Sequence, residues 1–338
     1  MATIGNTVLT LSDHAKRVDP DGKTPMIVEM LSQENAALDD MPFMEGNTAT
    51  GHEATIRSGL PTVFYRKMNM GVPKSKSTTV QVTENAAELV GRSELDVKVA
   101  SRNGNTNTFR LSESKAFVMA MGQQQATTLI YGTNANPEEY VGFAARYSDL
   151  SAVNAENILP AGGAGSDNTS IFLVGWGSET VFGVYPKGSK AGMDHEDLGV
   201  IDAFDSNNDR FRAYGDIYTW DNGLVVKDWR YVVRIPNIDV SDLIAKTGTQ
   251  AAAAATNITK LMSQSLARLP AIRSVKPIFY VNRTVAAHLM EMAMDKNSSF
   301  VGFKEARNQF GDNIHQLVFM DVPVKIMDVI VNNEAVVA

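Results

Sequence analysis

Residues 111–132, LSESKAFVMAMGQQQATTLIYG, form the stretch that decides how we interpret the rest of the chain. It contains no proline, and its apolar residues cluster at 116–121 and 126–131, on either side of three glutamines. Ser112 can accept hydrogen bonds from the free amides of a first helical turn, and Gly132 can adopt the left-handed backbone that ends a helix. We therefore expect one helix of roughly 30 Å, long enough to act as a strut across a whole domain.

The composition indicates a globular protein that can bury a sizeable core. The chain has 338 residues, of which 44% are hydrophobic, and its length suggests two or three structural units. It has no cysteine, which excludes disulfides and thiolate zinc sites. Its first residues lack a basic region before an apolar run, and no window approaches about 18 consecutive apolar residues. We therefore expect a soluble cytoplasmic protein. The net charge of -7 argues against a dedicated nucleic-acid binder.

The segments before the helix have different patterns. Residues 1–52 carry short apolar groups without a sustained period, so they cannot form a core of their own and are expected to lie along another surface as an arm. Residues 54–100 are typical of a long hairpin, with strands at 62–65 and 78–83 and a flexible tip at 67–77, KMNMGVPKSKS. Residues 55–80 contain five basic residues and no acidic residue, so this part of the hairpin carries about +5 within an acidic protein.

The second half of the chain predicts a mixed α/β unit. Asn222-Gly223 is a hairpin-turn signal, and a long strand to residue 235 should follow it. The other elements that the patterns predict are a helix at 136–147, strands at 170–174 and 179–185, a helix at 249–269, a strand at 277–281, a helix at 284–294, and one or two strands at 318–331 broken at Pro323.

Two stretches resemble nucleotide-binding loops, but each lacks a required group. GWGSET at 175–180 follows an apolar strand, yet Thr180 stands where a dinucleotide-binding loop has its third glycine. GVYPKGSK at 183–190 contains a proline, and its serine and lysine are in the reverse of the phosphate-loop order.

Two acidic stretches resemble metal sites and are incomplete as well. Asp205, Asn207, Asp209 and Asp216 have calcium-loop spacing, but Arg210 occupies the position that needs glycine. Residues 194–197, DHED, are adjacent and so rarely converge on one ion, and no second histidine lies four residues on. No nucleophile elbow is present. We therefore expect no catalytic, cofactor-binding or metal-binding residues, and no enzyme.

The order of arm, long hairpin, spine helix and mixed α/β unit resembles the major capsid proteins of tailed double-stranded-DNA bacteriophages, which have the Hong Kong ninety-seven fold. Residues 168–199 and 220–239 look like stretches of podophage-type coat proteins, and residues 281–300, VNRTVAAHLMEMAMDKNSSF, look like the strand and helix of the family's axial domain. In commoner members the block comparable to 277–331 precedes the block comparable to 170–235. Here it follows, which predicts a permuted strand order.

The resemblance implies an α+β capsid fold and its division into parts. Residues 1–52 would form the N-terminal arm, 53–100 the extended hairpin, called the E-loop in this family, and 101–150 the spine helix with the peripheral domain. Residues 151–338 would form the axial domain, with 222–238 returning to the peripheral sheet.

The resemblance also implies a structural function. The protein would be a coat protein that assembles into hexamers and pentamers of an icosahedral shell around double-stranded DNA, in the host cytoplasm and then in the virion. Its partners would be other copies of itself, a separate scaffolding protein, a portal protein, a decoration protein in some systems, and DNA without sequence specificity, with no membrane. Two alternatives are an encapsulin-like nanocompartment shell and a soluble α/β enzyme.

The basic hairpin supplies the expected contacts between subunits. The candidates are three apolar and four basic residues: Val63, Phe64, Tyr65, Arg66, Lys67, Lys74 and Lys76. Acidic partners could come from the eight carboxylates within 194–221 or from Glu138 and Glu139. By analogy Lys74 and Lys76 could donate crosslinks, but we expect noncovalent assembly.

Overall fold

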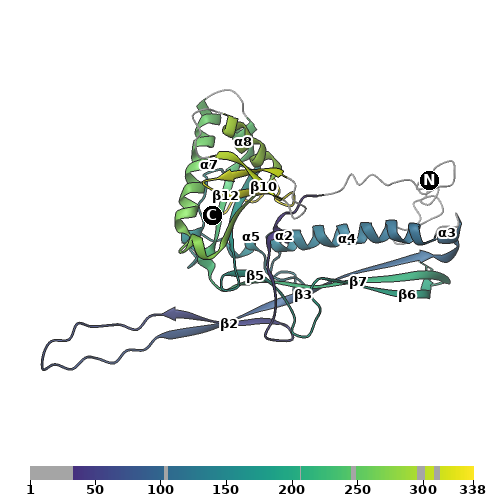
Figure 1. Cartoon of the computed structure of the whole chain (residues 1–338), viewed down its shortest axis with the longest axis horizontal. Coiled ribbons are helices and arrows are strands. Elements are labelled where there is room, and N and C mark those ends of the chain that lie inside the picture. The colour runs from purple at the N-terminus through teal and green to yellow at the C-terminus, as the bar shows by residue number, and fades with distance from the viewer. Residues whose placement is uncertain (1–32, 103–105, 206, 245–248, 295–300, 308–312) are drawn as a thin grey trace.

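The computed structural model describes residues 33–102, 106–205, 207–244, 249–294, 301–307 and 313–338. They form three regions, which we call the tower, the platform and the projecting hairpin (Figure 1). One branched sheet runs through all three in the order β10-β11-β12-β9-β4-β5-β7-β3-β2. The mixed α+β class is thus confirmed. Within the described residues, no helix is both long and apolar enough to cross a membrane.

The tower is built around strand β4 (Asn168–Trp176), all nine residues of which are buried. β8 (Val232–Asp239) and β9 (Lys276–Val281) pair with it in antiparallel fashion. The remaining tower elements are β10 (Val301–Arg307), β11 (Asn313–Phe319), β12 (Val322–Ile326), α6 (Val240–Ile244), α7 (Thr249–Arg268) and α8 (Arg283–Met294). The central run of β4, IFLV, is apolar without alternation, as expected for a strand that is buried on both faces, whereas the buried polar residues 168–170 at its start form hydrogen bonds. The permuted strand order stays a prediction.

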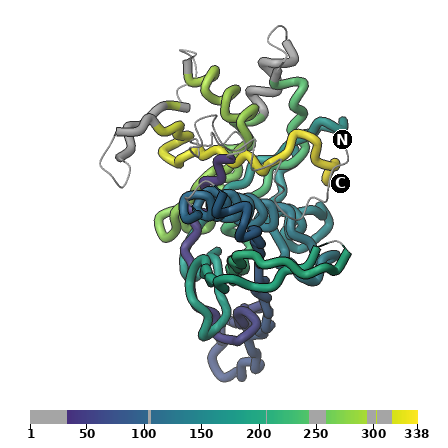
Figure 2. The backbone as a smooth tube through the Cα atoms, turned by 90° about the vertical axis from the view of Figure 1, so that its right-hand side faces the viewer, coloured from purple at the N-terminus to yellow at the C-terminus, as the bar shows by residue number. Residues whose placement is uncertain are grey.

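The platform consists of helix α4 (Thr106–Tyr131) lying along the strands β3 (Thr78–Asp96), β7 (Arg210–Val226) and β6 (Met193–Phe204), with the short helix α3 (Val97–Ser101) at its end. Phe117 of α4 stacks on Tyr218 of β7, with ring centroids 5.5 Å apart. Arg110 of α4 donates hydrogen bonds of 2.8 Å to Asp216 and to Asp197. Seen along the platform in Figure 2, blue α4 lies between the yellow C-terminal residues and the green strands.

The predicted spine helix exists, but its ends differ from the prediction. It begins at Thr106, and Ser112 lies inside it, where its hydroxyl donates to the carbonyl of Phe109. Residues 106–110, TNTFR, contain a single apolar residue, the buried Phe109, and so show no apolar period that would have extended the predicted helix. The helix ends at Tyr131, yet Gly132 does not adopt a positive φ. Glycine is needed there because a Cβ would lie 2.2 Å from the carbonyl oxygen of Tyr140.

Other local predictions need correction. Asn222 and Gly223 lie inside β7 rather than in a turn, and Gly223 is paired with both Ala86 and Val184. A Cβ at Gly223 would lie 2.9 Å from the Cα of Ala86, so close strand approach explains this glycine. Residues 62–65 are not a strand, since β2 is Gly51–Gly59, and of 136–147 only α5 (Phe143–Arg146) is helical. Pro323 lies within β12, and β10 and β6 were not predicted.

A strap of residues 33–46 runs from the tower to the platform. Its short helix α2 (Ala37–Asp40) packs against the tower, and β1 (Phe43–Glu45) pairs in parallel with β5 (Val181–Tyr185). The buried Asp40 accepts hydrogen bonds from Lys276, Lys325 and Tyr280, all from the tower. The part of the predicted arm that the structure describes therefore lies along another surface, while Met26 to Leu31 fall outside the described residues.

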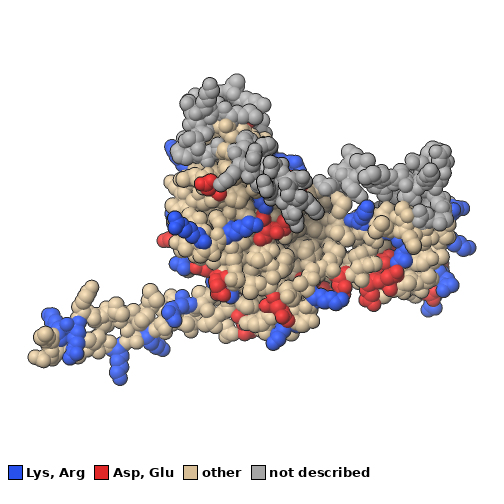
Figure 3. Space-filling view, viewed as in Figure 1, with Lys and Arg blue, Asp and Glu red and all other residues tan. Residues whose placement is uncertain are grey.

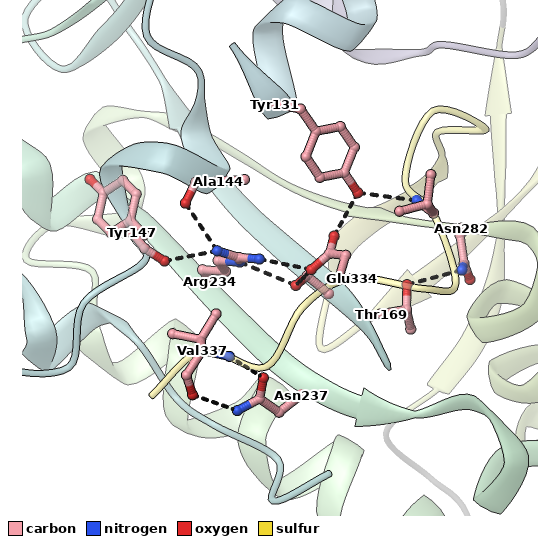
Figure 4. A network of polar contacts seen from close by, with 11 residues as sticks. Tyr131, Ala144, Tyr147, Thr169, Arg234, Asn237, Asn282, Glu334 and Val337 are labelled. Atoms are coloured by element: carbon pink, nitrogen blue, oxygen red, sulfur yellow. Dashed lines mark hydrogen bonds and ion pairs between the residues drawn. The ribbon is translucent and has the colours of Figure 1, made fainter. Parts of the chain in front are cut away.

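The C-terminal residues close a buried polar network at the junction of tower and platform (Figure 4). Arg234 of β8 donates a hydrogen bond of 2.7 Å to Glu334, and their side chains are 5% and 3% exposed. Tyr131, at the end of α4, donates to the other carboxylate oxygen of Glu334 at 2.6 Å. Arg234 also donates to the carbonyls of Ala144 and Tyr147, each at 3.0 Å. Ser170 of β4 accepts a hydrogen bond from Arg234 and donates one to Glu334, so this ion pair joins five segments of the chain.

Replacing Glu334 with Gln should lower the free energy of unfolding by about 3–5 kcal/mol, because Arg234 would keep its buried charge without an ionised partner. Chemical denaturation of the unassembled subunit measures this. The matched control is Glu94→Gln, which breaks a more exposed pair with Arg92 and should cost less than about 1 kcal/mol. Equal losses for the two variants would contradict the role assigned to the buried pair.

The contact between α4 and β6 should weaken in acid. The hydrogen bond from Arg110 holds the pKa of Asp197 below its ordinary value. Because the pKa of Asp197 is lower in the folded than in the unfolded protein, its ionised carboxylate adds to the free energy of unfolding above the unfolded pKa of about 3.9. This stabilisation is lost as the pH falls through the pKa of the folded state. Between pH of about 5 and about 2, the wild type should lose more unfolding free energy than Asp197→Asn. Parallel pH profiles would show that the pair contributes nothing.

Candidate subunit-contact surface

The hairpin projects from the body as a two-stranded ribbon with an extended tip (Figure 1). β2 pairs with the first part of β3, from Gly51 opposite Asn85 to Gly59 opposite Thr78. The tip, residues 60–77, has a turn at 68–69, and its few hydrogen bonds include Arg66 Nε to the carbonyl of Met70 at 3.1 Å. Every residue from 60 to 81 is exposed. No other described part of the chain therefore covers the hairpin beyond its root.

All seven predicted contact residues lie in this exposed tip. Val63 is 87% exposed and Tyr65 is fully exposed. The sequence interpretation missed further exposed apolar side chains of the same tip, namely Leu60, Met68, Met70 and Val72. They could have been predicted from the many large apolar residues within 60–72. These residues are as frequent as in a core strand but do not alternate as strand residues would. Monomeric soluble proteins rarely expose such an apolar cluster, so it indicates an interaction surface.

The structure separates the eight carboxylates within 194–221 into two groups. Asp216 is buried and is held by Arg110 and by His195, whose Nε2 lies 2.9 Å from its carboxylate, while Asp221 accepts a hydrogen bond from Ser189. The other six, which remain exposed, are Asp194, Glu196, Asp197, Asp202, Asp205 and Asp209. Figure 3 shows basic side chains along the hairpin at one end of the molecule and a concentration of acidic ones at the platform end.

The platform sheet is covered by helices on one face. Gly91 and Tyr218 lie against Phe117 of α4, so the residues that alternate with them face away from the helix. In Figure 1 no described helix or strand lies beneath this second face. We call it the bare sheet face, and its residues are Val90, Arg92, Glu94, Asp194, Glu196, Leu198, Ile201, Ile217 and Thr219. Val90 is 54% exposed, and the face combines apolar side chains with an excess of carboxylates.

Strand β6 forms one edge of the platform sheet. It pairs with β7 along its length, and no other described strand pairs with it. The register shifts between Asp197 and Gly199, and Gly199 has a φ of 69°, so the strand carries a bulge there.

The other motifs noted in the sequence have structural roles. Residues 177–180 form the tight turn between β4 and β5, where the Thr180 hydroxyl donates to the carbonyl of Gly175 at 2.8 Å. Asp205 accepts the amides of Asn207 and Asp209 within a loop. Residues 194–197 lie on strand β6, where adjacent side chains point to opposite faces of the sheet. In the described part of the chain, no group of three His, Cys, Asp or Glu is arranged to hold a metal ion.

Comparisons with known proteins agree with this architecture. The family model for major capsid protein GP7 matches residues 19–338. A chain in the structure of bacteriophage Epsilon15 is 29% identical, with a TM-score of 0.76, and the match covers 100% of this chain and 99% of that chain. A chain of the bacteriophage JBD30 capsid is 10% identical, with a TM-score of 0.46, and the match covers 89% of this chain and 93% of that chain. No curated protein matches.

Proposed function

Because the chain belongs to the family of major capsid protein GP7, we propose that its copies assemble into hexamers and pentamers of an icosahedral shell that encloses double-stranded DNA. The chain is a major capsid protein of the tailed-bacteriophage type and has the Hong Kong ninety-seven capsid fold. The observation that carries the proposal is the family match over residues 19–338, which includes both the hairpin and the platform.

The division into domains follows the same proposal. The tower would be the axial domain and the platform the peripheral domain, with 1–52 as the arm and 53–100 as the E-loop. In this proposal two boundaries are drawn differently from the sequence expectation. Residues 193–226, which include β6 and β7 beside α4, would be assigned to the peripheral domain, and β8, which pairs with β4, would be assigned to the axial domain. Local turn signals in the sequence do not indicate that β7 belongs with the peripheral domain, because β7 continues through Asn222-Gly223, where a turn was expected.

We propose further that the hairpin tip of one subunit binds the bare sheet face of the next. The tip offers apolar side chains with Arg66, Lys67, Lys74 and Lys76, and the bare sheet face offers apolar side chains with carboxylates such as Asp194 and Glu196. A two-stranded ribbon is barely stable alone, so it needs a second surface. In a closed ring each subunit can give its hairpin to one neighbour and receive one from the other.

The remaining parts of the proposal concern chemistry and partners. The protein would act structurally and without catalysis, and it would need no cofactor. It would assemble in the host cytoplasm with a scaffolding protein, a portal protein and, where one exists, a decoration protein, and it would contact DNA without reading its sequence. Expression followed by size-exclusion chromatography and electron microscopy tests the proposal, because megadalton shells or capsomers support it and a small oligomer would overturn it.

Replacing Arg66, Lys67, Lys74 and Lys76 together with Ser should leave the subunit folded but lower the yield of shells, most visibly at moderate salt. Exposed ion pairs contribute only about 0–1 kcal/mol each and are screened by salt. The yield of intact shells, measured by sedimentation across a salt series, reports the effect. A control that removes the same charge from the body is the replacement of Lys187, Lys260, Arg268 and Arg273 with Ser.

Replacing Phe64 and Tyr65 with Ser should reduce assembly more than the charge variant does and with little salt dependence. Burial of each large apolar side chain contributes about 1.5–3 kcal/mol, and this effect is not screened. A wild-type shell yield from this variant would contradict the proposed apolar contribution to the contact. A wild-type yield from the charge variant would contradict the proposed electrostatic contribution.

A further inference from the structure

The hairpin leaves the body at one short stretch of β3. From Ala86 onward β3 pairs with β7, whereas residues 78–85 pair only with β2. At this point the Arg146 guanidinium donates two hydrogen bonds to the carboxylate of Glu84, both at 2.6 Å. The side chains of Arg146 and Glu84 are 18% and 11% exposed. Such a bidentate pair fixes direction as well as distance, because both groups are planar.

The neighbouring strand β2 contacts the body through an aromatic ring and is also hydrogen-bonded to the side chain of Asn47. His52, opposite Glu84, contacts the ring of Phe182 edge-on, with centroids 5.5 Å apart. Beyond it lies a cavity of about 370 Å³, lined by His52, Glu53, Ala54, Thr55, Ile56, Glu179 and Lys227. Along β2 the root of the hairpin therefore borders open space, into which the ribbon could move if it were released.

Arg146 is itself held by the junction between tower and platform. It ends α5, and its own Nε donates to the carbonyl of Val141 at 3.0 Å. The carbonyls of Ala144 and Tyr147, on either side of it, accept hydrogen bonds from Arg234, the partner of Glu334. The backbone of residues 144–147 thus connects the buried network in Figure 4, through hydrogen bonds on either side of Arg146, to the root of the hairpin.

We propose that Arg146 is a positioning residue that fixes the angle of the hairpin through Glu84. The nine residues of β2 span roughly 30 Å, and residues 60–68 add up to about 30 Å more when extended. With a lever of roughly 60 Å, a rotation of about 5° at the root moves the tip by about 5 Å, which is enough to misplace a contact that needs hydrogen-bond and packing distances. This inference rests on the proposed function only where it concerns assembly.

The angle can be measured directly in the unassembled subunit. The chain has no cysteine, so Tyr65→Cys at the tip and Lys260→Cys on α7 introduce only the two intended labelling sites. Spin labels at these sites report the distribution of tip-to-tower distances. In otherwise wild-type protein we expect one narrow distribution. In Glu84→Gln the distribution should broaden by about 5 Å, because a neutral amide cannot hold both arms of the guanidinium.

The matched control is Glu53→Gln on the same ribbon. The Glu53 carboxylate accepts a hydrogen bond from the exposed side chain of Gln81, and the backbone bonds of Glu53 to Asn47 do not depend on that carboxylate. This variant should keep the narrow distribution. Arg146→Lys retains the positive charge but lacks the guanidinium that bonds both carboxylate oxygens, so it should broaden the distance distribution as well. It serves as the second variant if the melting curve shows that Glu84→Gln does not fold. We call Glu84→Gln and Arg146→Lys the clamp variants, because each removes the two-bond contact between Arg146 and Glu84. A narrow, unshifted distance distribution in a folded clamp variant would overturn the proposal.

Shell assembly gives a separate result. Assembly of the clamp variants, without the labelling cysteines, should fall while that of Glu53→Gln stays at the wild-type level. A broadened distribution with wild-type shell yield would support the clamp and would instead overturn the proposed role of the hairpin in assembly.

Discussion

The structure depends on one buried ion pair, Arg234–Glu334. Removing two charges from water is costly, and the pair is tolerated because nearly every donor and acceptor around it is satisfied by Tyr131, Ser170 and two backbone carbonyls. Since these partners come from α4, β4, β8 and the segments around α5 and the C-terminal residues, the geometry of the pair fixes how the platform helix meets the tower. The strap that carries Asp40 joins the tower to β5 at a second place.

The tower and the hairpin of one subunit differ in how completely they bury their apolar side chains. The tower buries β4 completely, whereas the hairpin displays apolar side chains from Leu60 to Val72 with no cover from its own body. Among the described residues the platform sheet has helices on one face only, which leaves the bare sheet face exposed at the opposite end of the molecule from the hairpin tip. The two exposed surfaces have opposite charge bias, and this asymmetry suits a ring of identical copies that meet head to tail.

The sequence predicted best the elements whose signal is local. α4 was found as a long stretch without proline, α7 from apolar residues at helical spacing that end before Pro270, and the exposed tip from its charge and turn residues. Gly223 was wrongly predicted to lie in a turn. The sequence alone does not distinguish a glycine that lets two strands approach closely from a glycine that a turn requires. Gln125, which lies within α4 and is 1% exposed, would be placed on the surface by composition. Arg234–Glu334 and Arg146–Glu84 pair residues far apart in the chain, so no local pattern encodes them.

The bulged, acidic edge of β6 has a consequence for a protein made in many copies. An open strand edge is a template on which another edge can dock, and repeated docking leads to fibrils. Two β6 edges that approach each other bring carboxylates together, and the bulge at Gly199 interrupts the straight ladder that such docking requires. Both features act against edge-to-edge docking of two copies and so favour other contacts between copies.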